Sequence, residues 1–215
     1  MTENRDTRLQ SRKPRSLRGR LQVKKQVKKH GAETVSQGLL EHLDLLQYPA
    51  KRGVRPEVAR SHASHSDFKR PERAGSYLAV GCPPRDGFEA HRAIFKGFTG
   101  VGKNVTYHDK PDSRLRQAFE GLMDHLSYLT ALTVDMPDGP PGAVLVLNST
   151  DLWRRALPYL EDPRLQKVRL YRENEARCHA TAQLVQSSQA GKLENMQRHY
   201  AGCEDLNDWL VDRTI

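Results

Sequence analysis

The chain has 215 residues, enough for one ordinary core with an appendage but not for two large cores. Its net charge of +9 is concentrated at the start: residues 1–30 hold eleven Lys or Arg and two acidic residues, so the remaining 185 residues are neutral overall. No apolar run approaches the roughly 18 residues of a membrane span, and the N-terminus lacks the apolar stretch of a signal peptide. We therefore expect a cytoplasmic protein without membrane contact.

Residues 1–34 are assigned to a basic, disordered arm, because the segment is polar, highly charged and poor in large apolar residues. Such an arm suits contact with DNA or RNA, since each phosphate that it neutralises releases counterions whatever the base sequence. The same composition also occurs in solvated tails, so charge alone leaves both interpretations open. The nucleic-acid interpretation assigns backbone contacts to Lys24, Lys25, Lys28 and Lys29.

The three cysteines, Cys82, Cys178 and Cys203, are far apart in the sequence. None belongs to a C-x-x-C pair of the kind that builds a zinc finger or a redox motif. We therefore predict neither a zinc ion nor a disulfide.

Residues 35–110 are predicted to form a small α+β lead-in, beginning with two helices. Apolar residues recur at helical spacing over Val35–Leu46, and Pro56 is suited to the first turn of a second helix, Pro56–His62. Residues 63–74 are polar and contain His65 and Asp67, with His62 just before them. A metal site could be drawn there, but the composition favours a surface loop.

A short β-hairpin is predicted next, because Ser76–Cys82 is apolar and stops at two prolines, and Phe88–Phe95 can return beside it. The glycine-rich stretch 96–103 superficially resembles a phosphate-binding loop. Its lysine lacks the spacing and the strand-to-helix context of such a loop, so we predict a turn. Lys96 and Lys103 in this turn are candidates for contact with phosphate.

Residues 111–215 alternate between short apolar runs and helical patterns, which is typical of a mainly parallel sheet with crossover helices. We predict an α/β fold with a mostly parallel four-stranded sheet flanked by helices. The expected strands are Leu115–Phe119, Ala143–Leu147, Lys167–Tyr171 and Leu193–Met196. The expected helices are Leu122–Leu132, Asn148–Tyr159, Ala176–Ser187 and Glu204–Leu210.

Acidic residues follow three of these strands, where the loops of a parallel sheet converge at the carboxyl edge. They are Glu120 after the first strand, Glu173 and Glu175 after the third, and Asp205 after the fourth. Carboxylates that meet on one edge repel one another unless a cation lies between them, and oxygen ligands favour Mg²⁺ or Mn²⁺. Such an ion could neutralise charge during phosphoryl transfer or anchor a nucleic-acid backbone.

Four stretches resemble the TOPRIM domain of bacterial primase-type proteins, in particular those on plasmids and mobile elements of the Bacteroides group. They are residues 87–97, Phe119–Leu129, Val144–Ser149 and Asp205–Leu210, and the order and spacing are similar over about two thirds of the chain. The resemblance implies a TOPRIM-like domain over residues 111–215, with Glu120 as a catalytic residue and metal ligand. The zinc finger that commonly precedes this domain in the family has no counterpart in the sequence.

The Asp-x-Asp motif of the family is altered in this chain. If the end of the third strand sets the register, Glu173-Asn174-Glu175 takes its place, with one residue deleted afterwards. If the following helix sets the register, Arg172-Glu173-Asn174 takes its place and the metal pair is lost. We favour the first alignment because it keeps two acids one residue apart.

Purely structural roles are the alternative interpretation for these residues. Glu120 could merely complement a helix dipole, and Asp124, His125 and His179 are expected at the surface.

Two functional classes therefore remain. The chain is either a metal-dependent nucleotidyl-transfer module for plasmid or mobile-element replication or a catalytically inactive relative that only binds nucleic acid. For the first class, a separate zinc-finger, polymerase or helicase protein is a candidate partner.

Overall fold

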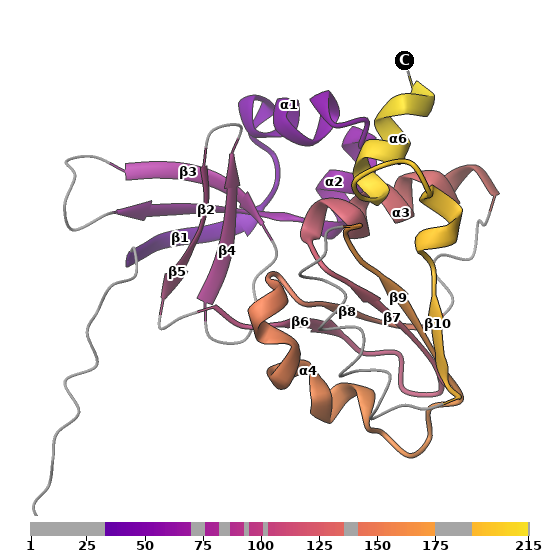
Figure 1. Cartoon of the computed structure of the whole chain (residues 1–215). Helices are drawn as coiled ribbons and strands as arrows, with labels where there is room; N and C mark the ends of the chain where they lie inside the picture. Colours follow the sequence, from indigo (N-terminus) through magenta and orange to yellow (C-terminus); the bar gives the residue numbers. More distant parts are fainter. Residues whose placement is uncertain are drawn as a thin grey trace, which may run out of the picture.

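The computed structural model describes residues 33–69, 76–81, 87–92, 95–100, 103–135, 142–174 and 191–214. These residues form two five-stranded sheets, one antiparallel and one mixed, with helices packed beside and between them (Figure 1). The predicted fold class, a mostly parallel four-stranded sheet after a helical lead-in with one short hairpin, is therefore wrong. The lead-in contains a complete sheet of its own, and the second sheet has a fifth, antiparallel strand.

The first sheet is antiparallel and its strands follow one another in sequence order. Its strands are β1 (Glu33–Leu39), β2 (Ser64–Lys69), β3 (Ser76–Gly81), β4 (Gly87–Arg92) and β5 (Phe95–Gly100). The hydroxyl groups of Thr34 on β1 and Thr99 on β5 are 2.6 Å apart and hydrogen-bonded. The two edge strands therefore approach each other at this point, and the sheet bends into a half-barrel.

Three of these strands have sequences that do not resemble strands. The predicted helix over Val35–Leu46 is wrong in its first half, because β1 exposes 51% of Val35 and 70% of Leu39 and so lacks an apolar face to recognise. The predicted surface loop over residues 63–74 contains β2, which buries only Ser66 and Phe68 on one face. The predicted glycine-rich turn contains β5. In each case pairing with neighbouring strands, rather than an apolar pattern, determines the structure.

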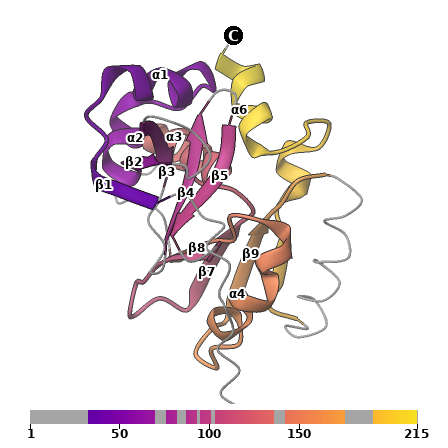
Figure 2. The same ribbon diagram turned by 90° about the vertical axis from the view of Figure 1, so that its left-hand side faces the viewer.

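Two short helices, α1 (Leu43–Lys51) and α2 (Pro56–His62), lie between the first sheet and the rest of the chain (Figures 1 and 2). The bounds of α2 are those predicted, with Pro56 in its first turn. The helix α1 continues through Pro49, which the prediction had placed beyond the helix end.

The second sheet has the strand order β10-β9-β7-β8-β6. Four of its strands are parallel, as predicted: β7 (Leu115–Phe119), β8 (Ala143–Val146), β9 (Lys167–Tyr171) and β10 (Leu193–Asn195). The fifth, β6 (Thr106–His108), pairs antiparallel with β8 at the edge. With three residues, β6 is too short to give an alternating sequence pattern.

The helices of this part are α3 (Leu122–Asp135), α4 (Trp153–Leu160) and α6 (Leu206–Thr214), with short 3₁₀ turns η1 (Thr150–Leu152) and η2 (Gln197–Tyr200). The predicted helix Ala176–Ser187 lies outside the described residues. Among the described helices, none has the length and apolar character needed to cross a membrane.

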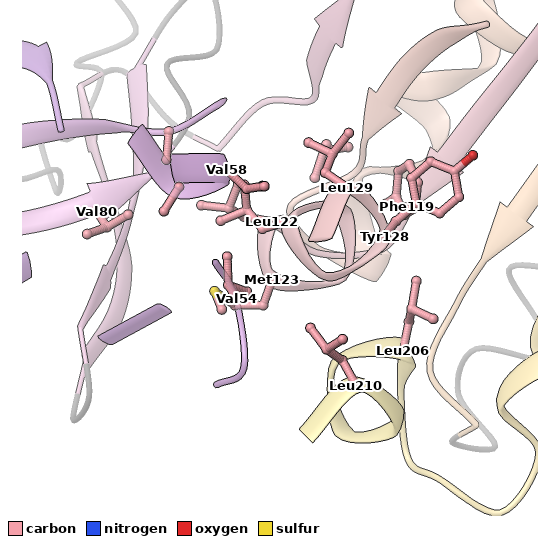
Figure 3. Close-up of a cluster of buried hydrophobic side chains, with 14 of the residues drawn as sticks. Val54, Val58, Val80, Phe119, Leu122, Met123, Tyr128, Leu129, Leu206 and Leu210 are labelled. Atoms are coloured by element: carbon pink, nitrogen blue, oxygen red, sulfur yellow. The ribbon is translucent and has the colours of Figure 1, made fainter. Parts of the chain in front are cut away.

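Two apolar clusters cover the two faces of the mixed sheet. The larger one joins α1, α2 and β3 to α3 and α6, and Figure 3 shows Val54 and Val58 beside Leu122 and Met123. The smaller one lies under α4 and includes Ala156. Because the larger cluster combines residues from both sides of the predicted boundary at residue 110, α1, α2 and Val80 of β3 pack directly against the mixed-sheet part, while Phe68, Ala79 and Ala90 form a separate small cluster within the first sheet.

Candidate functional site

Two of the predicted acids meet at the carboxyl edge of the parallel strands. Glu120 follows β7 directly and is 8% exposed, and its backbone N–H donates to the carbonyl of Tyr171 at the end of β9 (3.0 Å). The backbone N–H of Glu173 donates to Oε2 of Glu120 at 3.2 Å. The strand pairing of β7 with β9 therefore brings the loops that carry Glu120 and Glu173 into contact.

Asp205 reaches the same edge from the start of α6. The loop before it is tied to the loop after β9, because the N–H of Asn174 donates to the carbonyl of Glu204 at 2.8 Å. One carboxylate oxygen of Asp205, Oδ1, accepts the N–H of Asp208 at 2.7 Å and so caps the helix. The other carboxylate oxygen, Oδ2, takes no part in this helix cap.

Asp124 completes the acidic group, and the prediction of a surface position for it is wrong. It is 5% exposed, and burial is the main reason that the pKa of its carboxyl lies well above the usual value. The negative charges of Asp205, Glu173 and Glu120 raise this pKa further. These four residues, Glu120, Asp124, Glu173 and Asp205, are called the acidic edge below. Asp124 lies in the first turn of α3, four residues after Glu120, and this closeness in sequence to a predicted site residue is the signal that could have indicated it.

One oxygen of Asp124, Oδ1, is buried without a hydrogen-bond partner among the described residues. A buried carboxylate oxygen with no donor is costly, which favours either a proton or a cation at this position. Within the described residues, however, no three acidic, histidine or cysteine side chains are arranged tightly enough to hold a metal ion. Glu175, the remaining predicted ligand, lies outside the described residues.

The backbone around Arg172 bears on the two alignments of the altered motif. Phe119 pairs with Tyr171, so Arg172 follows its strand as Glu120 follows β7. The hydroxyl of Tyr200 accepts the N–H of Arg172 and donates to its carbonyl, both at 2.9 Å. The N–H of Arg172 is therefore used by Tyr200, and the amide that contacts the Glu120 carboxylate belongs to Glu173. Because Glu175 is not described, the choice between the alignments stays a prediction.

A cation from the lead-in also reaches this edge, which the sequence did not indicate. Nη2 of Arg52, in the turn after α1, lies 4.0 Å from Oδ2 of Asp205 and 3.9 Å from Oδ1 of Asp208. Its Nε donates to the side-chain oxygen of Asn207, a residue that is fully buried.

A group of histidines lies behind the acidic edge, where α2, β6 and α3 meet. The ring of His125 on α3 is 6.2 Å from that of His62 and 6.1 Å from that of His108, measured between centroids. His125 is 2% exposed, so its predicted surface position is wrong. Burial, reinforced by the charges of His108 and His62, lowers the pKa of His125 to about 3. His179 lies outside the described residues.

The predicted nucleic-acid contacts are only partly described. Lys24, Lys25, Lys28 and Lys29 lie outside the described residues. Lys96 belongs to β5 rather than to a turn. Lys103 is exposed, and its carbonyl accepts a hydrogen bond from Nη1 of Arg155 at 2.7 Å. Its predicted contact with phosphate stays a prediction.

No family model matches the sequence, and no curated protein is similar to it. Solved structures do share its fold. The primase fragment of the bacteriophage T7 primase-helicase protein superimposes with a TM-score of 0.56 at 14% identity, covering 76% of this chain and 68% of that chain. A chain from the complex of bacteriophage T7 lagging-strand DNA polymerase with primase domains bound to an RNA/DNA hybrid and dTTP gives a TM-score of 0.55 at 14% identity, covering 77% of this chain and 84% of that one. The chain therefore has a primase-type fold, as the resemblance implied, although its sheets differ from those predicted.

Proposed function

We propose that this protein is primase-like and transfers nucleotides on a nucleic-acid template during DNA replication, with Mg²⁺ or Mn²⁺ bound at the acidic edge. The observation that carries the proposal is the buried Oδ1 of Asp124, which has no hydrogen-bond donor among the described residues and lies within the electrostatic reach of three further carboxylates. The primase-type fold of the two T7 structures supports the same function. A plasmid or mobile-element origin remains part of the proposal.

The donor atoms at this edge have the chemistry that suits a hard divalent cation. Carboxylate oxygens are the donors that Mg²⁺ and Mn²⁺ prefer, and a cation would relieve the repulsion that raises the pKa of Asp124. Glu120, Asp124, Glu173 and Asp205 would hold the ion, with Glu175 as a further candidate. When bound, the metal would neutralise negative charge on the phosphates of a nucleotide.

The protein's own contribution is to hold these side chains in place. The amide of Glu173 orients Glu120, and the helix cap orients Asp205. DNA or RNA is the expected partner, with the basic arm contributing contacts to the phosphates. A separate zinc-finger, polymerase or helicase protein could supply template reading, since the T7 primase domains interact with a lagging-strand polymerase.

A second function, nucleic-acid binding without catalysis, is favoured by one observation. Arg52 already places a positive charge beside Asp205, and the described residues include no compact group of three ligands. In that case the acidic edge would have only a structural role.

The Glu120→Gln variant separates the two functions. It removes one charge at nearly constant shape, so the metal-free protein should melt at the same or a slightly higher temperature, while the metal-induced gain should disappear. Metal at a concentration of about ten times its Kd would stabilise the wild type by about 1.4 kcal/mol. Glu161→Gln, an exposed site at the end of α4, is the matched control and should retain the gain.

The measurements are thermal melts with 0 to several millimolar Mn²⁺ or Mg²⁺, together with primer synthesis on a single-stranded template. Primer synthesis should disappear in Glu120→Gln and persist in Glu161→Gln. A wild-type protein that binds single-stranded DNA but shows no metal-dependent shift would contradict the catalytic proposal and favour the second function.

A further inference from the structure

The position of Arg52 is fixed from two sides. Its carbonyl accepts a hydrogen bond from Nδ2 of Asn207 at 2.8 Å, and its own Nε donates to Oδ1 of the same residue. Asn207 also donates to the hydroxyl of Ser127 on α3 at 2.7 Å, and it is completely buried. The guanidinium is therefore held at the acidic edge by a network that joins the lead-in, α3 and α6.

The same network reaches the buried carboxylate. The backbone N–H of Asn207 hydrogen-bonds Asp124 and lowers its pKa against the stronger effects that raise it. Asn207 thus contacts Asp124 through its backbone and Arg52 through its side chain. The arrangement places a fixed positive charge 4.0 Å from a candidate metal ligand, Asp205, whose side chain is 17% exposed.

A fixed cation at this distance has two opposite effects. It attracts the carboxylates of the metal-free edge and so offsets their mutual repulsion. It also repels an incoming divalent ion and competes with it for the Oδ2 atom of Asp205. Both effects follow from the charge of Arg52, whereas the hydrogen bond to Asn207 depends on its guanidinium geometry.

We propose that Arg52 is a resident counter-cation that stabilises the metal-free acidic edge and lowers its affinity for a divalent metal ion. This role rests on the proposed function, because it requires a metal site at the acidic edge. Arg52 is a positioning residue in this scheme, since it acts through Asp205 and Asn207. Its position in the lead-in makes the metal affinity dependent on how the α1–α2 turn packs against α6.

Substitutions at position 52 can separate charge from hydrogen bonding. Arg52→Gln removes the charge, whereas Arg52→Lys keeps the charge and loses the guanidinium contact with Asn207. Arg52→Met removes the charge while keeping the aliphatic stem, and it replaces the Gln variant if that variant does not fold. Arg60→Gln removes one exposed charge from the last turn of α2 and serves as the control.

Binding of Mn²⁺ is measured from the loss of the free-ion electron paramagnetic resonance signal in each full-length protein. We expect Arg52→Gln to bind Mn²⁺ about tenfold more tightly than the wild type, with Arg52→Lys and Arg60→Gln within a factor of about two of the wild type. Arg52→Gln and Arg52→Lys should both melt at a lower temperature than the wild type without metal. A purely structural role would lower the melting temperature without tightening the binding of Mn²⁺.

Two results would overturn the proposal in different ways. If the wild type binds Mn²⁺ and Arg52→Gln binds it equally or more weakly, or if Arg52→Lys tightens binding as much as Arg52→Gln does, then the counter-cation role is wrong and the proposed function stands. If neither the wild type nor any variant binds Mn²⁺, then the proposed metal-dependent function fails, and the role of Arg52 fails with it.

Discussion

Replacing His125 with Phe should make the protein less sensitive to acid. In the folded chain burial lowers the pKa of His125 to about 3, compared with an ordinary value of 6.5. As the pH falls below 6.5, the unfolded chain takes up a proton at this residue while the folded chain does not. Stability is therefore lost as the pH falls from 6.5 towards 3.

The size of the effect follows from the shift in pKa. Each unit corresponds to about 1.36 kcal/mol, so lowering the pH from 7.5 to 4.5 should cost the wild type about 2.7 kcal/mol through His125 alone. Phe has no ionisable group and can keep the ring contact with Phe119, whose centroid lies 5.2 Å from that of His125. The variant should therefore lose about 2.7 kcal/mol less than the wild type over this interval.

Urea unfolding at pH 7.5 and pH 4.5 measures both free energies of unfolding. The difference between the two pH values is the quantity to compare, because it cancels any packing cost of Phe at neutral pH. His199→Gln changes an exposed histidine and should lose as much stability as the wild type does. Equal losses in the wild type and in His125→Phe would show that His125 is not held neutral by burial, and the reasoning would be refuted.

Three further predictions concern packing and nucleic-acid contact. Asn207→Ala should destabilise the protein by about 2–4 kcal/mol in urea unfolding, because it leaves the carbonyl of Arg52 and the hydroxyl of Ser127 without their buried donor; an effect below about 1 kcal/mol would contradict the network. Gly142→Ala should cost about 2 kcal/mol or more, since φ is +102° and a Cβ would lie 2.5 Å from the carbonyl oxygen of Leu115; an unchanged melting temperature would refute this. Deleting residues 1–30 should weaken binding to single-stranded DNA and flatten its salt dependence in fluorescence anisotropy, whereas an unchanged slope would identify the arm as a tail.

In the parallel part of the mixed sheet, β8 could be predicted most directly because it is apolar throughout. All four residues of β8 are buried, so the sequence shows one continuous apolar run bounded by turn residues. The lead-in sheet could not be predicted in the same way. In β1 most side chains are exposed, and its apolar residues were assigned to a helix, whereas in β2 the buried positions include Ser66, so a polar composition was interpreted as a loop.

The candidate site was predictable where residues follow strands in sequence. Glu120 and Glu173 were found because parallel strands end at one edge, and the amide contact between their loops agrees with that argument. Asp124 and His125 were placed at the surface because α3 was expected to bury one apolar face. The described part of α3 is instead buried from Leu122 to Thr130, so polar residues on every side of it are enclosed.

The role of the lead-in depends on contacts that no local pattern reveals. Arg52 and Asn207 are 155 residues apart in the sequence, yet Nε of Arg52 donates to the side chain of Asn207, whose Nδ2 donates back to the carbonyl of Arg52. The apolar cluster that joins α1 and α2 to α3 and α6 holds this junction in place. A fragment restricted to residues 111–215 would keep all the predicted acids but would lose the only cation that the described structure pairs with Asp205. The acidic edge is therefore built from the helical lead-in and the mixed sheet together, and the proposed counter-cation role of Arg52 depends on a residue that lies outside the parallel strands.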